Sequence, residues 1–166
     1  MNQQVKVLFV CMGNICRSPT GEGVFRHYVN NSGYGDVIQI ASAGISDYHA
    51  GSPADRRMRQ AAARRGYALT SIARQVTFED INCFDLIIAM DHDNLAGLES
   101  LAQGVRPHIR LLGTFLGQSV TNATARAVPD PYYGGMDGFE KVLDMIEQAC
   151  PAMLACSLEI LQAKGR

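Results

Sequence analysis

The chain has 166 residues, of which 47% are hydrophobic and 19% are charged, so it can bury the core of one globular domain and is not disordered. Its 15 Lys and Arg residues and 16 Asp and Glu residues give a formal net charge of −1, which argues against a broadly basic surface for nucleic acids or membranes. The five cysteines cannot all pair within the chain, and they indicate reduced thiols rather than a secreted disulfide framework.

No targeting signal or membrane span is apparent in the sequence. The start of the chain, Met1-Asn2-Gln3-Gln4, is polar. The apolar run over residues 7–12 is shorter than the core of a signal peptide and far shorter than a bilayer span. We therefore expect a cytoplasmic protein that inserts into no membrane and has no nucleic-acid partner.

Strand and helix patterns alternate along the chain. Val5–Val10 is short, apolar and rich in β-branched residues, which is typical of a buried strand. Pro19 suits the first turn of a helix, whereas Pro151 is expected to kink or break a helix interior. In chain order we predict a strand at Val5–Val10, a helix from Pro19, a strand at Val37–Ala41, a helix from Pro53 to about Arg65, a strand at Phe84–Met90, a helix from about His92 to Ala102, a weaker strand at Ile109–Leu112 and a helix from Phe139 to about Gln162.

This alternation predicts a single α/β domain over residues 1–166. Strands separated by helices form a parallel sheet with right-handed crossovers. We therefore expect a three-layer domain in which a small parallel sheet of about four strands is flanked by helices on both faces. Ligands of such sheets bind at the carboxyl ends of the strands, so the loop after Val10 and the Met90-Asp91 turn are the first places to search for a site.

The loop over residues 11–18 has the ingredients of an anion-binding site. It lacks the G-x-x-x-x-G-K-[ST] and G-x-G-x-x-G patterns of nucleotide-binding loops. It nevertheless joins a strand to a helix N-terminus, where unpaired N–H groups favour an anion. Gly13 and Asn14 tolerate the positive φ angles that turn successive N–H groups inward. The predicted phosphate-binding loop consists of Met12, Gly13, Asn14, Ile15, Cys16 and Ser18.

Cys11 and Arg17 stand at the two rims of this loop. A helix N-terminus or a nearby cation stabilises a thiolate, so Cys11 is a candidate nucleophile. The planar guanidinium of Arg17 can hold two phosphoryl oxygens, and Ser18 can donate a hydrogen bond to the thiolate. The alternative interpretation of Cys11 is a small buried hydrophobic residue at the end of a strand.

Val10–Pro19 resembles the active-site loop of the low molecular weight protein tyrosine phosphatases. The resemblance extends over nearly the whole chain, and the chain length also matches. Further landmarks follow in the order in which the family has them: Ser42-Ala43-Gly44, Ala73-Arg74-Gln75, Phe84-Asp85, Met90-Asp91 with Asn94, and Val128-Pro129-Asp130-Pro131-Tyr132.

The resemblance implies three catalytic residues. Cys11 would attack phosphorus to form a phosphocysteine, and Arg17 would bind the phosphate. Asp130 would protonate the phenolate leaving group and then activate the water that hydrolyses the intermediate. Taken by itself, the Asp130-Pro131 pair could equally be an ordinary turn. We therefore expect a hydrolase of phosphotyrosine monoesters that needs no cofactor and no metal.

The resemblance also implies a deep, narrow cleft that suits a phosphotyrosine ring. Tyr132 and Tyr133 would form one wall, although they could instead be loop aromatics that pack on the body of the domain. Tyr48 and His49 would form the opposite wall, or would belong to a solvated loop. Ile15 is apolar at a loop position where relatives that act on phosphoarginine carry Thr, so it favours an aryl phosphate.

Asn14, Ser18 and Ser42 resemble a family network that supports the shape of the loop. The family often has a His at the position of Ser71, hydrogen-bonded into this network. Since this chain has a serine there, we expect that side of the network to be rebuilt by other groups, for instance by water.

Cys16 is the second cysteine of the loop. It could form a reversible disulfide with Cys11 under peroxide and so protect it from further oxidation, or it could be a packing residue. The other three cysteines have no expected role. Asp91-His92-Asp93 is interpreted as a strand end and a helix cap rather than a metal site, because three consecutive residues cannot easily face one ion.

Other functions remain as alternatives. An arsenate reductase-like thiol redox enzyme on the same fold would need a distal cysteine pair, and the matching region offers only Cys83. A phosphoarginine phosphatase would share the loop and the fold. A non-catalytic phosphoresidue-binding protein would be favoured if the nucleophile or the acid were missing, and both are present. The expected partner is a phosphotyrosine-bearing protein, such as a bacterial tyrosine kinase or a host protein.

Overall fold

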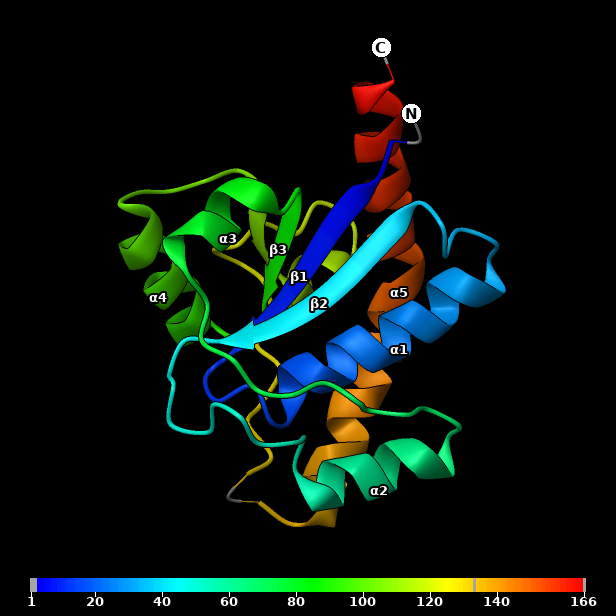
Figure 1. Cartoon of the computed structure of the whole chain (residues 1–166), viewed down its shortest axis with the longest axis vertical. Helices are drawn as coiled ribbons and strands as arrows, with labels where there is room; N and C mark the ends of the chain where they lie inside the picture. Colours follow the sequence, from blue (N-terminus) through cyan, green and yellow to red (C-terminus); the bar gives the residue numbers. More distant parts are fainter. Residues whose placement is uncertain (1–2, 133, 166) are drawn as a thin grey trace.

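Four parallel strands form one sheet at the centre of the protein (Figure 1). The structure is a computed structural model that describes residues 3–132 and 134–165. The sheet order is β2-β1-β3-β4, and the strands are β1 (Val5–Cys11), β2 (Ile38–Gly44), β3 (Leu86–Ala89) and β4 (Ile109–Leu111). Helices cover both faces, so the predicted α/β class and the three-layer arrangement are confirmed.

The helices divide between the two faces of the sheet (Figure 1). One face is covered by α1 (Arg17–Asn31), α2 (Arg56–Arg64) and the long α5 (Met136–Lys164). The other is covered by α3 (Phe78–Cys83) and α4 (His92–Ala102), while the short 3₁₀ helix η1 (Leu112–Phe115) follows β4. Within the described residues, no helix, including the 29-residue α5, is long and apolar enough to span a bilayer.

The central strand β1 is apolar along its whole length because both of its faces are covered. Val7 and Phe9 pack toward α1 and α5, whereas Leu8 and Val10 pack toward α3 and α4. All four side chains are fully buried. Burial of such a side chain contributes roughly 1.5–3 kcal/mol, so β1 fixes the centre of the domain and, with it, the position of the loop that follows.

The strand order places the end of β1 at a topological switch point. The chain passes from β1 to β2 on one side and then reaches β3 on the other side of β1. Ligands of open parallel sheets bind at the carboxyl edge beside such a reversal. Cys11 is the last residue of β1 and pairs with Gly44, the last residue of β2.

Several element boundaries differ from the predicted ones. The helix α1 begins at Arg17 rather than at Pro19, and β2 runs from Ile38 to Gly44 rather than ending at Ala41. Two short elements, α3 and η1, were not predicted. Of the kink or break expected at Pro151, the break is wrong, because α5 runs through this residue, as the predicted helix from Phe139 to about Gln162 does. Pro151 is exposed, and buried residues on both sides of it hold the helix against the sheet.

Candidate active site

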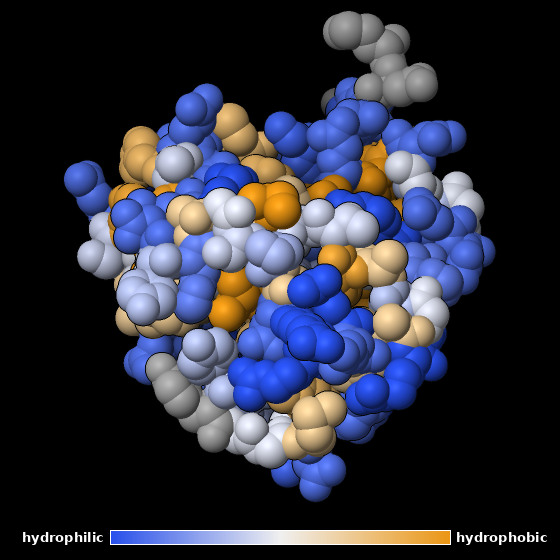
Figure 2. Space-filling view, turned by 60° about the horizontal axis from the view of Figure 1, so that its bottom comes forward, coloured by the Kyte–Doolittle hydropathy of each residue, from blue (hydrophilic) through white to orange (hydrophobic). Residues whose placement is uncertain are grey.

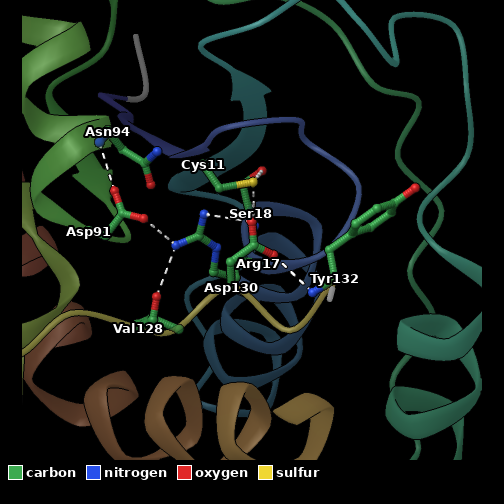
Figure 3. Close-up of polar contacts among 8 residues, drawn as sticks. All are labelled: Cys11, Arg17, Ser18, Asp91, Asn94, Val128, Asp130 and Tyr132. Atoms are coloured by element: carbon green, nitrogen blue, oxygen red, sulfur yellow. Dashed lines mark hydrogen bonds and ion pairs between the residues drawn. The ribbon is translucent and has the colours of Figure 1, made fainter. Parts of the chain in front are cut away.

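Cys11 lies at the end of β1 and faces the first turn of α1 (Figure 3). Its sulfur lies 3.0 Å from the hydroxyl oxygen of Ser18, and the backbone N–H of Ser18 donates to it over 3.4 Å. The residue is 3% exposed. The sulfur therefore lies beside the hydroxyl and the backbone N–H of Ser18 at a helix N-terminus, where unpaired N–H groups stabilise negative charge.

Asn14 holds the loop in its curved shape. Its φ angle of 57° lies in the left-handed region, which asparagine tolerates better than most residues. Its side-chain amide donates to the hydroxyl oxygens of Ser18 at 2.7 Å and Ser42 at 3.0 Å. Its side-chain oxygen accepts a hydrogen bond from the backbone N–H of Arg74 at 3.0 Å. The structure thus brings Asn14, Ser18 and Ser42 together, as the resemblance implies.

Ser71 does not take part in this network. Its hydroxyl is buried and has no hydrogen-bond partner among the described residues. The support on this side comes instead from the backbone of Arg74, whose N–H reaches Asn14 and whose carbonyl accepts from the N–H of Gly44 at 2.8 Å. The network is therefore closed by main-chain groups, which any residue except proline would supply at position 74.

Arg17 is fixed by two acceptors that come from other elements. The side chain is 3% exposed, and its Nη1 donates to Asp91 Oδ2 at 2.6 Å and to the carbonyl of Val128 at 2.9 Å (Figure 3). The other oxygen of Asp91 accepts from the N–H of Asn94 at 2.7 Å, and in this way caps α4 as expected. Asp91 thus joins the start of α4 to the guanidinium beside Cys11.

Asp91 and Val128 are contacts that the sequence interpretation missed. The Met90-Asp91 turn was predicted as a place to search for a site and Asp91 as a strand end and helix cap, but not as a partner of Arg17, although Asp91 follows β3, the strand beside β1. Carboxyl ends of neighbouring parallel strands meet at one edge, so an acid two residues after β3 could have been suspected as a partner of Arg17. The contact of Val128 depends on the path of a long loop, and nothing in the local sequence signals it.

Asp130 lies at the rim of the site. Its Oδ2 is 3.6 Å from Arg17 Nη2, and its Oδ1 accepts from the backbone N–H of Tyr132 at 3.0 Å (Figure 3). The Asp130 side chain is 43% exposed, against 23% for Asp91. One carboxylate therefore anchors Arg17 from behind, while the other faces the open side of the site.

A cavity of about 360 Å³ opens over the loop, within the usual size range for small-molecule sites. Its floor is formed by Cys11, Met12, Gly13, Ile15, Cys16 and Arg17, and its rim by Ser46, Tyr48, His49, Asp130 and Tyr132. Ser46 is an addition to the predicted set. Asn14, Ser18 and Ser42 are not among the lining residues, since they support the loop from behind.

Aromatic side chains form the walls of the cavity. The rings of Tyr48 and His49 are 4.8 Å apart in an edge-to-face arrangement, and the ring of His49 is 6.1 Å from that of Tyr132. A Cβ atom added to Gly13 would lie 3.0 Å from the ring of His49, so the glycine allows this close approach. Tyr133, predicted for the same wall, lies outside the described residues.

Cys16 is a buried thiol next to the nucleophile candidate. Burial raises its pKa far above the usual range, and the nearby charge of Asp55 and that of Cys11 act in the same direction. Cys16 therefore stays protonated at neutral pH, and the two loop cysteines have different environments. The distal cysteine pair that an arsenate reductase-like enzyme would need is not found among the described residues. Cys83 ends α3 just before β3 and so lies at the amino ends of the strands, whereas Cys11 lies at the carboxyl end of β1.

The described parts of the chain contain no group of three or more His, Cys, Asp or Glu side chains arranged to hold a metal ion. In particular, His92 of the Asp91-His92-Asp93 segment lies 3.1 Å from the carbonyl oxygen of Asn122. The lining of the cavity places a cysteine, an arginine and a carboxylate where they could act on an anion.

A cysteine at a helix N-terminus, beside a fixed arginine and at the switch point of a parallel sheet, is an arrangement typical of cysteine-dependent phosphatases. The comparisons with known proteins agree. Residues 6–165 match the sequence profile of the family described as low molecular weight phosphotyrosine protein phosphatase. The chain belongs to this family, whose members are cysteine-dependent protein tyrosine phosphatases.

Relatives cover almost all of the chain. A low molecular weight protein-tyrosine-phosphatase of Streptomyces coelicolor is 41% identical over 163 residues, which is 97% of each chain. The crystal structure of YfkJ from Bacillus subtilis is 37% identical with a TM-score of 0.85, covering 95% of this chain and 96% of that one. The Drosophila arginine phosphatase has 33% identity and a TM-score of 0.80, covering 91% and 96%.

Proposed function

We propose that this protein hydrolyses phosphotyrosine in proteins through a phosphocysteine on Cys11. The observation that carries the proposal is the position of the Cys11 sulfur, which accepts from Ser18 at the start of α1 and lies on the floor of a cavity that Arg17 and Asp130 also line. A phosphoryl group over this sulfur would meet the inward N–H groups of the loop and the guanidinium of Arg17.

In the first step, the Cys11 thiolate attacks phosphorus. The S–P bond forms, the bond from phosphorus to the tyrosine oxygen breaks, and Asp130 donates its proton to the departing phenolate oxygen. Arg17 can hold two of the equatorial oxygens as they gain charge, which stabilises the transition state more than the ground state. Asp91 and the Val128 carbonyl keep the guanidinium in place for this task.

In the second step, water attacks phosphorus and the S–P bond breaks. Asp130, now ionised, accepts a proton from the water, and inorganic phosphate leaves. The released thiolate is stabilised by the hydroxyl and the N–H of Ser18, at 3.0 and 3.4 Å from the sulfur. Each residue thus returns to its starting protonation state.

Replacement of the nucleophile tests the mechanism. Cys11→Ser should lower kcat on a phosphotyrosine peptide by at least about a thousandfold, because an alcohol at this site is a far weaker nucleophile than a thiolate. Binding of inorganic phosphate, measured by calorimetry, should persist. Cys83→Ser, which removes an exposed thiol at the far edge of the sheet, is the matched control and should keep full activity. Turnover retained in Cys11→Ser would overturn the proposal.

The Drosophila arginine phosphatase supports a second candidate substrate, phosphoarginine. Two features of the cavity favour the aryl phosphate: Ile15 is apolar, and Tyr48, His49 and Tyr132 form aromatic walls. Peptides that carry phosphotyrosine, phosphoserine or phosphoarginine in the same sequence would decide. We expect the highest kcat/KM with phosphotyrosine, and a higher value with phosphoarginine would assign the protein to the second activity.

We also propose that Cys16 protects Cys11 during oxidation. Peroxide would convert the Cys11 thiolate to a sulfenic acid, and the Cys16 thiol would then attack that sulfur while its proton passes to the departing hydroxyl, so that a disulfide forms and water leaves. A thiol reductant should therefore restore activity after brief peroxide treatment. In Cys16→Ser, less activity should be recovered, because Cys11 proceeds to irreversible oxidation. Equal recovery in both proteins would leave Cys16 as a packing residue.

A further inference from the structure

The helix α2 carries an unusual concentration of positive charge. Five arginines occur within residues 56–65, in a chain whose net charge is −1. The lower part of the molecule in Figure 1, where α2 lies, comes forward in Figure 2, and strongly hydrophilic residues gather on that face. These arginines are outside the phosphate-binding loop, and the proposed mechanism does not use them.

Three of the five arginines are already paired with carboxylates. Arg57 forms an ion pair with Asp55 at 3.1 Å. Arg64 and Arg65 pair with Glu140 of α5 at 3.8 and 2.8 Å, and Arg65 also reaches other acids of α5. Their charges are therefore largely balanced within the domain.

Arg56 and Arg59 differ from these three. Neither has a carboxylate within ion-pair distance among residues 3–132 and 134–165, and both are exposed. Arg59 is nevertheless oriented, since its Nε donates to the carbonyl of Ala54 at 2.9 Å. The two residues are three positions apart on the helix and so lie on neighbouring parts of one face. We call this pair the basic patch.

The start of α2, where Arg56 lies, borders the cavity. The N–H of Asp55, the residue before Arg56, donates to the carbonyl of Ile15 at 2.7 Å. The Nη2 of Arg57, the residue after it, donates to the carbonyl of Tyr132 at 3.1 Å. Ile15 lies on the cavity floor and Tyr132 on its rim. Since consecutive Cα atoms are about 3.8 Å apart, the backbone of Arg56 lies one residue from the backbone contact of Asp55 to the cavity lining, and Arg59 follows about one helical turn further along α2.

We propose that Arg56 and Arg59 bind acidic residues that flank the phosphotyrosine in the protein substrate. The inference rests on the proposed function, and adds a preference for Asp or Glu close to the phosphotyrosine in sequence. Two neighbouring cations repel each other on the helix surface, and an acidic segment that crosses the rim supplies the missing opposite charge. A carboxylate can accept two hydrogen bonds from one guanidinium, so the contact is directional as well as electrostatic.

The test compares two phosphotyrosine peptides that differ only in having Asp and Glu, or Asn and Gln, beside the phosphotyrosine. We expect kcat/KM for the acidic peptide to be about five- to tenfold higher, because exposed ion pairs each contribute modestly. At 1 M salt, where the screening length is about 3 Å, the ratio should fall below about twofold. In Arg56→Gln/Arg59→Gln the ratio should be close to one at all salt concentrations.

The control is Arg106→Gln, which removes one positive charge from a residue just before β4, at the amino ends of the strands and away from the cavity. It should leave the peptide ratio unchanged. Both values of kcat/KM are measured on the same protein preparation, so a partial loss of folded protein lowers both equally and leaves their ratio unchanged. A wild-type enzyme that hydrolyses both peptides equally would overturn the docking proposal but leave the proposed function intact, whereas no hydrolysis of either peptide would overturn the proposed function itself.

A membrane is the competing anionic partner. If the wild-type protein binds vesicles that contain phosphatidylserine, the double variant does not, and the two peptides are hydrolysed equally, the basic patch is a membrane contact and the proposal is wrong.

Discussion

Two carboxylates contact Arg17 from different sides, and their surroundings suggest different tasks. Asp91 is hydrogen-bonded through both oxygens, one to Arg17 and one to the N-terminus of α4, so it is held in a single position. Asp130 is more exposed, lies 3.6 Å from Arg17 and lines the cavity. We assign the positioning of the guanidinium to Asp91 and proton transfer to Asp130. Single substitutions can separate these two assignments.

Removal of the Asp130 carboxyl should affect poor leaving groups most. Asp130→Asn should lower kcat/KM on phosphotyrosine by about a hundredfold or more, because general acid catalysis commonly contributes 10²–10⁴. With a nitrophenyl phosphate, whose phenolate leaves readily without a proton, the loss in the first step should be much smaller. Asp137→Asn, an exposed acid at the start of α5, is the control. Equal losses on both substrates would argue against a general acid role.

Removal of the Asp91 charge should weaken the hold on Arg17 while keeping the helix cap. Asparagine caps helices about as well as aspartate, so the cap of α4 should persist in Asp91→Asn, whereas loss of the ion pair with the buried Arg17 should lower the unfolding temperature. A hydrogen bond between charged partners contributes about 1.5–3 kcal/mol, so kcat/KM and phosphate affinity should fall by about ten- to a hundredfold. Unchanged phosphate affinity in a normally folded variant would show that Val128 alone positions the guanidinium.

The sequence predicts those parts of the site that are local. Cys11, Asn14 and Arg17 occur within one loop, so their spacing and the following helix suffice to indicate an anion site. The contacts of Arg17 to Asp91 and Val128 span 74 and 111 residues. Such contacts follow from strand order and loop path, which the residue pattern does not specify.

At the scale of elements, the end of β2 packs directly against the phosphate-binding loop. A Cβ atom on Gly44 would lie 2.9 Å from the carbonyl oxygen of Met12 and 3.1 Å from Asn14. Both neighbours are held by hydrogen bonds, since Met12 accepts from Ser46 and Asn14 is bonded to three groups. Neither can move without a change in the curvature of the loop.

Gly44→Ala should therefore disturb both stability and binding. Overpacking of this kind costs about 1–3 kcal/mol, which urea unfolding would measure, and the affinity for inorganic phosphate should fall with it. Gly165→Ala, where the added Cβ would be 3.5 Å from its nearest neighbour, is the control and should match the wild-type protein. A Gly44→Ala protein with unchanged phosphate affinity would mean that the loop tolerates displacement of Met12.

The elements that were predicted correctly are those with a strong hydrophobic period or run. The helix α3 was missed because it has only six residues, although Thr77 and Asp80 form a capping box that signals its start. The break expected at Pro151 is wrong for a different reason. One lost hydrogen bond and a steric clash count against the helix locally, but burial of Cys150, Met153 and Leu154 against the domain outweighs them.

At the scale of the whole molecule, Arg74 links the phosphate-binding loop to α3, on the face of the sheet that α3 and α4 cover. Its backbone N–H donates to Asn14, and its guanidinium pairs with Asp80 of α3 at 2.9 and 3.2 Å. Asp80 in turn accepts from the N–H of Thr77 to close the capping box. The support of the loop therefore extends through residues 73–80 to α3.

This link should weaken in acid. Burial would raise the pKa of Asp80, but the hydrogen bonds from Arg74 and Thr77 outweigh burial and hold the pKa below its usual value. Because the carboxyl has a lower pKa in the folded than in the unfolded protein, its stabilisation is complete above about pH 4 and is lost as the pH falls through the folded-state pKa.

Asp80→Asn should therefore be less stable than wild type by about 1 kcal/mol at pH 7, measured by urea unfolding, and the difference should shrink as the pH approaches 2. Asp36→Asn, at an exposed position, should show neither effect. A constant difference between Asp80→Asn and wild type from pH 7 to pH 2 would mean that the asparagine loses packing or cap geometry, and not a charge, at this position.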